Sequence, residues 1–157
     1  MSREIKFRAW DEIGEWMGNV TSIDFNEGAV FIETKHSDDE NRFDMNNVPV
    51  MQYTGLKDKN GKEIYEGDII NYSFKDSGEI NTRVLEVYND GTNFKTREIY
   101  RDYWLEKVGG VLLIVHGQLN AHKGKTQYLT DISCSSIYSY EIIGNIYENP
   151  ELLEVTT

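Results

Sequence analysis

Several features that define common protein classes are scarce in this 157-residue chain. It has one cysteine, Cys134, so it cannot form a disulfide within itself, and we expect a reducing compartment. No stretch approaches the roughly 20 apolar residues of a membrane helix, and the N-terminus lacks the apolar core of a signal peptide. These absences together favour a cytoplasmic protein that does not enter the membrane.

Residue patterns of catalysis and metal binding are also missing. The three histidines, His36, His116 and His122, have none of the short spacings with which helices hold zinc, and a single cysteine cannot complete the set. The sequence has no Gly-x-Ser-x-Gly nucleophile elbow, no Gly-x-Gly-x-x-Gly and no Walker-type phosphate loop. We therefore predict no catalytic residue, no metal and no cofactor.

Positive charge is in short supply. The net charge is −11, from 27 acidic against 16 basic residues. Domains that hold phosphates usually gather positive charge on one face, so a general nucleic-acid binder is disfavoured. A local basic patch remains a speculative binding surface, although lysines in turns are most often simply solvated. Its members would be Lys57, Lys59 and Lys62 around a central turn, and Lys123 and Lys125 in a later loop.

The features that are present indicate β-structure. Residues 5–9 alternate apolar and charged side chains, as half-buried strands do. Residues 17–25 form a weaker strand candidate, and residues 29–32 are rich in β-favouring side chains. Loop residues 11–15 and a turn at 26–28 separate these segments, so we expect an N-terminal β-meander.

The central run from Met51 to Ile70 contains two turn signals. Asn60-Gly61 predicts a type I′ hairpin turn, because both central residues of that turn need positive φ. Gly67-Asp68 predicts a corner before the apolar strand that follows, with Gly67 at a positive φ or at a close approach of two segments. A tight hairpin followed by such a corner is common in small SH3-like barrels, where the corner lets a strand cross between orthogonal sheets.

The second half of the chain mixes signals. Strands are expected at residues 83–88, at 111–115 and at 138–147, the last with a bulge or bend near Gly144. Residues 96–107 are predicted to form a short helix, because aromatic and aliphatic side chains recur four residues apart and Gly109-Gly110 follows. Asn149-Pro150 favours a terminal helical turn.

We thus predict a mostly β protein, all-β to α+β: an SH3-like barrel with an N-terminal β-meander and one short helix. Residues 1–157 are expected to form a single domain, with a possible sub-division into the meander at 1–47 and the barrel at 48–150, the latter carrying an insert at 76–137. The length is compatible with one hydrophobic core that needs no covalent support.

Three blocks of sequence resemble the YopX family, which is found in bacteriophages and prophages of bacteria. They are Arg3-Glu4-Ile5-Lys6-Phe7-Arg8-Ala9-Trp10-Asp11, the central run from Met51 to Ile69, and Tyr140-Glu141-Ile142-Ile143-Gly144-Asn145-Ile146-Tyr147-Glu148-Asn149-Pro150-Glu151-Leu152-Leu153. The resemblance implies a phage or prophage protein in the cytoplasm of a bacterial host. It implies no activity and assigns no catalytic or binding residue, since what is shared is turn and core chemistry.

Three functional hypotheses follow. The leading one is a non-enzymatic interaction protein that binds a protein partner or assembles with itself, favoured by the abundance of aromatic residues, 12% of the chain, and by the negative charge. The second is a nucleic-acid-associated module using the five lysines, or conversely an acidic DNA mimic that acts on a host enzyme. The third is an enzyme that uses the acidic group Glu63, Glu66 and Asp68, residues that otherwise serve the turn.

Overall fold

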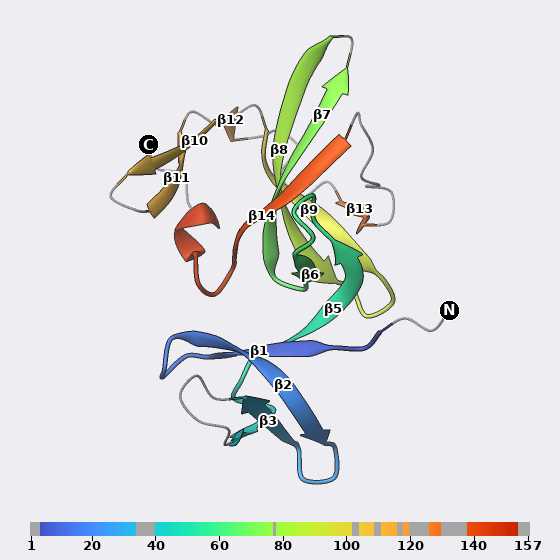
Figure 1. The fold of residues 1–157 in the computed structure, drawn as a ribbon, viewed down its shortest axis with the longest axis vertical. Helices are drawn as coiled ribbons and strands as arrows, with labels where there is room; N and C mark the ends of the chain where they lie inside the picture. Colours follow the sequence, from blue (N-terminus) through green and yellow to red (C-terminus); the bar gives the residue numbers. More distant parts are fainter. Residues whose placement is uncertain are drawn as a thin grey trace. The chain divides into compact units, whose positions relative to one another are not determined.

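The computed structural model describes residues 4–33, 40–76, 78–101, 104–108, 111–115, 118–119, 126–129 and 138–153 (Figure 1). The chain packs as two compact units, Met1–Gly55 and Leu56–Thr157. Nearly all regular structure within the described residues is antiparallel β-sheet, so the mostly β prediction is confirmed. His36, His116, His122 and Cys134 lie outside the described residues, as do the two later lysines of the speculative patch.

The first unit is a four-stranded antiparallel meander with a fifth strand, β5, added at its side. Its strand order is β4-β3-β2-β1-β5, so consecutive strands pair until β5 returns beside β1. The final strand continues past Gly55 into the second unit, where its end lies next to β6. These strands are β1 (Phe7–Asp11), β2 (Trp16–Asp24), β3 (Ala29–Glu33), β4 (Glu40–Asp44) and β5 (Val50–Lys57).

A small apolar core holds this meander together. Ala9, Val30 and Ile32 are fully buried, and Trp16 and Phe43 are among the half-buried side chains that pack against them. The expected alternation is visible in β3, where Val30 and Ile32 are buried while Phe31 is only half-buried. The predicted N-terminal meander is therefore present.

The second unit is built on a curved sheet of order β12-β9-β8-β7-β14, with β13 also paired to β9. In Figure 1, β7 and β8 form a long hairpin with β14 alongside β7. A separate hairpin pairs β10 with β11. The strands are β6 (Glu63–Tyr65), β7 (Asp68–Asp76), β8 (Glu79–Asn89), β9 (Phe94–Arg101), β10 (Trp104–Val108), β11 (Val111–Val115), β12 (Gln118–Leu119), β13 (Thr126–Tyr128) and β14 (Tyr138–Asn145).

This sheet buries side chains on both faces. Successive residues of a strand point to opposite sides, so Ile70 enters one core, with Leu85 and Val87, while its neighbour Ile69 enters another. The second core is closed by Leu152 from the 3-10 helix η2 (Pro150–Leu153). The predicted terminal helical turn is thus confirmed, and the predicted irregularity near Gly144 appears as a register shift between β14 and β7.

The predicted helix over residues 96–107 is wrong. This segment contains β9, which pairs with β8, and β10, which pairs with β11. The four-residue spacing of aromatic and aliphatic side chains was ambiguous, because these residue types also suit strands. Hairpin pairing with β8 and the two-sided burial of β9 decided between the two structures.

The predicted SH3-like barrel can be compared with the strand order of the two large sheets. Both large sheets have two ends in the part of the chain that the structure describes, so no closed barrel is found there. The SH3-like barrel therefore stays a prediction, and so does the sub-division at residue 47.

Candidate interaction surface

The central hairpin joins β5 to β6 through a turn that Asp58 organises. Its Oδ1 accepts hydrogen bonds from the amides of Asn60 (2.8 Å) and Lys62 (2.9 Å), and the Gly61 amide donates to the Asp58 carbonyl (2.9 Å). Gly61 has φ +81°, but Asn60 has no positive φ. The type I′ prediction is therefore wrong; a three-residue turn with glycine in the left-handed position forms instead, because the Asp58 carboxylate caps it.

The same turn is bound to the last strand of the sheet. Asp58 Oδ2 accepts a hydrogen bond from the amide of Ile142 (3.1 Å), and the Lys59 amide donates to the carbonyl of Tyr140 (3.0 Å). These contacts link residues more than 80 positions apart in the sequence. Asp58 is consequently a structural residue, buried despite its charge.

Burial and hydrogen bonding act in opposite directions on Asp58. Desolvation alone would raise the pKa of its carboxyl group. Hydrogen bonds from the amides of Ile142, Lys62 and Asn60, together with the Lys62 charge, lower this pKa by more than desolvation raises it. The pKa of Asp58 therefore lies below its ordinary value of 3.8. The carboxylate stays ionised under physiological conditions and holds the turn against β14.

The three described lysines of the speculative patch are exposed around this turn. Lys59 forms an ion pair with Glu141, whose other carboxylate oxygen accepts a hydrogen bond from Asn60 (3.3 Å). The positive charge of Lys59 is thus locally balanced. Lys57 and Lys62 are exposed beside it, and the structure does not describe Lys123 and Lys125.

The predicted corner forms at Gly67-Asp68. Gly67 has φ +80°, as the sequence indicated, and its amide and carbonyl bind Val87 (2.8 Å) and Ile146 (2.9 Å). Asp68 is 1% exposed, and its Oδ2 accepts the amide hydrogen of Tyr65 (2.7 Å). The corner is a packed junction within the sheet.

The acidic group of the enzyme hypothesis occupies this corner. Asp68 caps the turn through the Tyr65 amide, and Glu63 accepts a hydrogen bond from the Tyr65 hydroxyl (3.0 Å). Glu66 is half-buried and has contacts of its own. Within the described ranges, no group of three or more histidine, cysteine or acidic side chains is placed to hold a metal ion.

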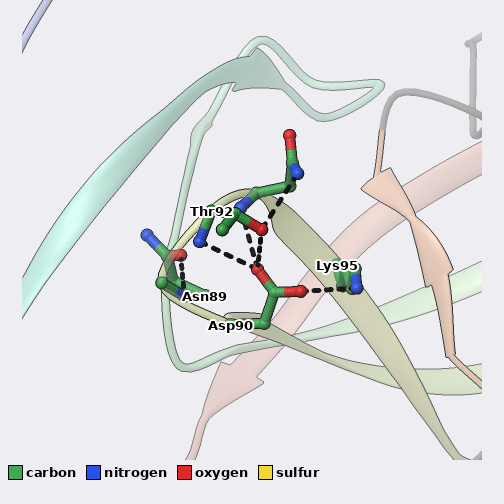
Figure 2. Close-up of polar contacts among 6 residues, drawn as sticks. Asn89, Asp90, Thr92 and Lys95 are labelled. Carbon is green, nitrogen blue, oxygen red and sulfur yellow. Dashed lines mark hydrogen bonds and ion pairs between the residues drawn. The ribbon is translucent and has the colours of Figure 1, made fainter.

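A second carboxylate-centred turn joins β8 to β9 (Figure 2). Asp90 Oδ1 accepts hydrogen bonds from the Thr92 amide (3.0 Å), the Thr92 hydroxyl (2.7 Å) and the Asn93 amide (2.9 Å). Its other oxygen pairs with Lys95. The Lys95 ammonium, assisted by these hydrogen bonds, holds the pKa of the Asp90 carboxyl far below its usual range. These partners lie in the turn itself or, for Lys95, at the start of β9, so the role of Asp90 is structural.

Among the described residues, the most exposed large apolar side chain lies at the tip of the β1–β2 hairpin. Ile13 is 96% exposed and stands between Glu12 and Gly14. Asp11 shapes this tip: Oδ1 accepts the Ile13 amide hydrogen (3.0 Å), and Oδ2 accepts the indole N–H of Trp16 (3.1 Å). Sequence patterning identified the loop but not the exposure of Ile13, because a single apolar residue in a turn has no periodicity.

A comparable turn joins β2 to β3. Phe25 is 80% exposed there, and Asp24 Oδ1 caps the turn through the amides of Asn26 (2.9 Å) and Glu27 (3.1 Å). Glu27 also pairs with Arg42 of β4 (3.3 Å). In the second unit Ile80 is 75% exposed near the end of the β7–β8 hairpin. Isolated exposed apolar residues are common on proteins, so their importance depends on how each is presented.

The fold and its turns define an antiparallel β protein of two units, whose buried carboxylates cap turns and whose most exposed apolar groups stand on hairpin tips. The described part of the chain contains no helix long and apolar enough to cross a membrane. The YopX family model, described as the YopX protein, matches residues 6–154. The chain therefore belongs to the YopX family, which confirms the resemblance of its three sequence blocks.

Two solved structures are similar over nearly their whole length. Protein YopX from Bacillus subtilis is 22% identical, with 95% of this chain and 98% of that chain covered and a TM-score of 0.54. Protein EF1440 from Enterococcus faecalis is 27% identical, with coverages of 98% and 100% and a TM-score of 0.47. The first similarity supports the fold. None of the curated proteins compared with the chain matches it.

Proposed function

We propose that this protein is a non-enzymatic interaction module of a phage or prophage, acting in the cytoplasm of the bacterial host through a protein partner or through self-assembly. The observation that carries this proposal is the display of large apolar side chains on hairpin tips, Ile13 above all. Exposed apolar groups fixed by a rigid scaffold are what binding surfaces offer to partners. For the second unit we propose an SH3-like barrel, an architecture supported by the corner at Gly67.

The use of the acidic residues supports a non-enzymatic role. General acid–base catalysis needs a carboxyl group that faces a substrate with a suitable pKa. Asp58 and Asp68 instead accept hydrogen bonds from backbone amides. The lowered pKa of Asp58 suits a carboxylate that serves as a permanent hydrogen-bond acceptor. The ion pair of Lys59 with Glu141 likewise reduces the charge available to a nucleic acid.

The test is tagged expression in a bacterial host, followed by affinity purification with quantitative mass spectrometry and by light scattering of the purified protein. We expect either a stoichiometric partner or a defined oligomer. A strict monomer that retains no partner above an untagged control would contradict the proposal. Salt-sensitive binding to a 30-base-pair DNA duplex would instead favour the nucleic-acid hypothesis.

A further inference from the structure

We propose that the tip of the β1–β2 hairpin is a protein-docking anchor, in which Ile13 enters an apolar pocket rimmed by lysine or arginine on a different protein. This inference rests on the proposed interaction function and names its surface and the chemistry of the partner. We call residues 11–16 the Ile13 tip.

The first argument is exposure. Ile13 leaves 96% of its surface in water, more than Ile5 (69%) or Phe25 (80%). Burying a whole isoleucine side chain in a partner would favour binding by roughly 10- to 150-fold. A single such residue at the centre of a small contact is able to act as its main anchor.

The second argument is preorganisation. Asp11 binds both the Ile13 amide and the Trp16 indole, so the two sides of the tip are tied to one carboxylate. Trp16 packs in turn against the buried core of the first unit. Gly14 lies so close to the Trp16 ring that a Cβ there would approach it to 2.6 Å. A hairpin tip whose backbone is already held in place loses little conformational freedom on binding.

Backbone strain at the Ile13 tip also indicates that its conformation is fixed. Glu15 has φ +50°, and it is the one residue other than glycine with a positive φ in the described ranges. Such conformations are costly for residues with a Cβ and persist only where the surroundings enforce them. Asp11 and Trp16 supply that enforcement.

The third argument is charge, which selects the partner. Glu12 and Glu15 flank Ile13 and are both exposed, and Asp11 lies beside them. In a symmetric contact, a second copy of this chain would bring its own acidic tip to this surface, which like-charge repulsion disfavours. A pocket rimmed by cationic side chains complements the tip, and the encounter is then accelerated by attraction between opposite charges.

Phe25 provides the comparison within the same unit. It lies beyond the opposite end of β2, a strand whose nine residues span about 27 Å. The turn that carries Phe25 has less net negative charge, because Glu27 forms an ion pair with Arg42. We therefore assign the docking role to the Ile13 tip and treat position 25 as the control.

The experiment places a photoreactive aliphatic diazirine amino acid at position 13, 25 or 80 of the full chain and irradiates it in bacterial host cells. We expect position 13 to give one dominant cross-linked protein, and the cross-linked peptide to lie in an apolar site with neighbouring lysine or arginine residues. Positions 25 and 80 should give at least five-fold less of that product. A dominant cross-link to a second copy, or to an acidic surface, would refute the assignment.

Binding of the purified cross-linked protein to variants then checks the chemistry. Ile13→Ser should weaken binding at least ten-fold, Ile13→Leu by less than three-fold, and Phe25→Ser by less than two-fold. The double change Glu12→Gln and Glu15→Gln should slow association and reduce its dependence on salt. Equal effects of Ile13→Ser and Phe25→Ser would contradict an anchor at position 13.

Failure of this inference is distinguishable from failure of the proposed function. A partner or oligomer that cross-links through position 80 but not through position 13 leaves the interaction function in place and removes the Ile13 tip. Absence of a specific product from all three positions, with a monomer in solution, contradicts both.

Discussion

Asp58 shows how one carboxylate determines local structure. Its two oxygens accept hydrogen bonds from three backbone amides, two within the turn and one on β14. A buried amide left without an acceptor costs more than the hydrogen bond itself contributed, since water cannot replace the lost partner. The Asp58 side chain therefore contributes more to the free energy of unfolding than an exposed acidic side chain that accepts no backbone hydrogen bonds.

We expect Asp58→Ala to lower the free energy of unfolding by about 2–4 kcal/mol, because three amides lose their acceptor. Asp58→Asn should lower it less, since the amide oxygen still accepts two of the bonds. Glu12→Ala is the control, as this exposed residue should change stability by less than about 0.5 kcal/mol. Urea denaturation monitored by circular dichroism measures all three, and equal values for Asp58→Ala and Glu12→Ala would contradict the role assigned to Asp58.

The pH dependence of stability follows from the lowered pKa of Asp58. The folded carboxyl group binds a proton less readily than the unfolded one, so its stabilisation is complete above the unfolded value near 3.8. It is lost as the pH falls through the folded pKa. We expect wild-type protein to lose more stability than Asp58→Asn over this acidic range, as measured by thermal unfolding at successive pH values; parallel curves would be inconsistent with it.

A substitution at Gly18 tests how closely the core of the first unit is packed. A Cβ on this residue would overlap the side chains of Ile32 and Trp16. We expect Gly18→Ala to destabilise the protein by about 1–3 kcal/mol through overpacking and to change the tryptophan fluorescence. Gly28→Ala, where nothing lies within 4 Å, tests backbone strain without crowding and should leave the fluorescence unchanged. The same spectral change in both variants would contradict this explanation.

At the scale of elements, β8 and β9 carry two ion pairs of different burial. Arg97 binds Glu86 through two nitrogens at 2.7 and 3.1 Å in a half-exposed setting. Glu98, only 2% exposed, lies 3.6 Å from Arg83, whose guanidinium stands 4.9 Å from the Phe74 ring. Exposed pairs contribute little because water and salt screen them, whereas a buried charge depends on its partner.

We expect Glu86→Gln to cost less than about 1 kcal/mol and Glu98→Gln to cost about 1–3 kcal/mol. Denaturation at low and high salt measures both, and only the Glu86 effect should shrink at 0.5 M NaCl. A Glu98 effect smaller than that of Glu86 would show that burial does not govern these pairs. A double-mutant cycle with Arg97→Ala would isolate the exposed pair.

Sequence reasoning identified elements whose signals are local. The Gly67 corner, the meander and the strand at residues 111–115 were predicted because turn chemistry and alternation are written in neighbouring residues. The segment 96–107 was misjudged because its residues suit both helix and strand, and its structure depends on hairpin pairing with β8 and β11, which lie outside the segment. The type of the central turn was missed because the Asn-Gly signal took no account of the Asp58 carboxylate, which caps the turn through the amides of Asn60 and Lys62.

The candidate interaction surface was harder to predict from the sequence than the fold was. The speculative patch was chosen by charge, and the structure shows one of its lysines paired with Glu141. Ile13 was overlooked because exposure is a property of the folded hairpin. Its presentation depends on Asp11 and Trp16 acting together, which composition does not reveal.

At the scale of the whole molecule, negative charge is shared by both units. Residues 1–55 contain 11 acids and 5 bases, and the rest of the chain contains the other 16 acids and 11 bases. Repulsion between like charges opposes the compact state, and dissolved salt screens it. The 27 acidic residues outnumber the 16 basic ones, so even one-to-one pairing would leave a net charge of −11.

We expect the melting temperature to rise by about 2–5 °C between 10 and 200 mM NaCl, because the screening length falls from roughly 30 Å to below 10 Å. Differential scanning fluorimetry measures this, with sucrose at equal osmolality as the control. A fall in the melting temperature would mean that favourable ion pairs outweigh the overall repulsion.

The contact of the Asp58 turn with β14 has a consequence for how the protein behaves when crowded. The outermost strand of a sheet normally offers a row of free amides and carbonyls on which another chain is able to grow. Here the Tyr140 carbonyl and the Ile142 amide are already engaged by the protein's own turn. The Asp58 turn thereby occupies two of the backbone groups through which a strand of another molecule would pair with β14.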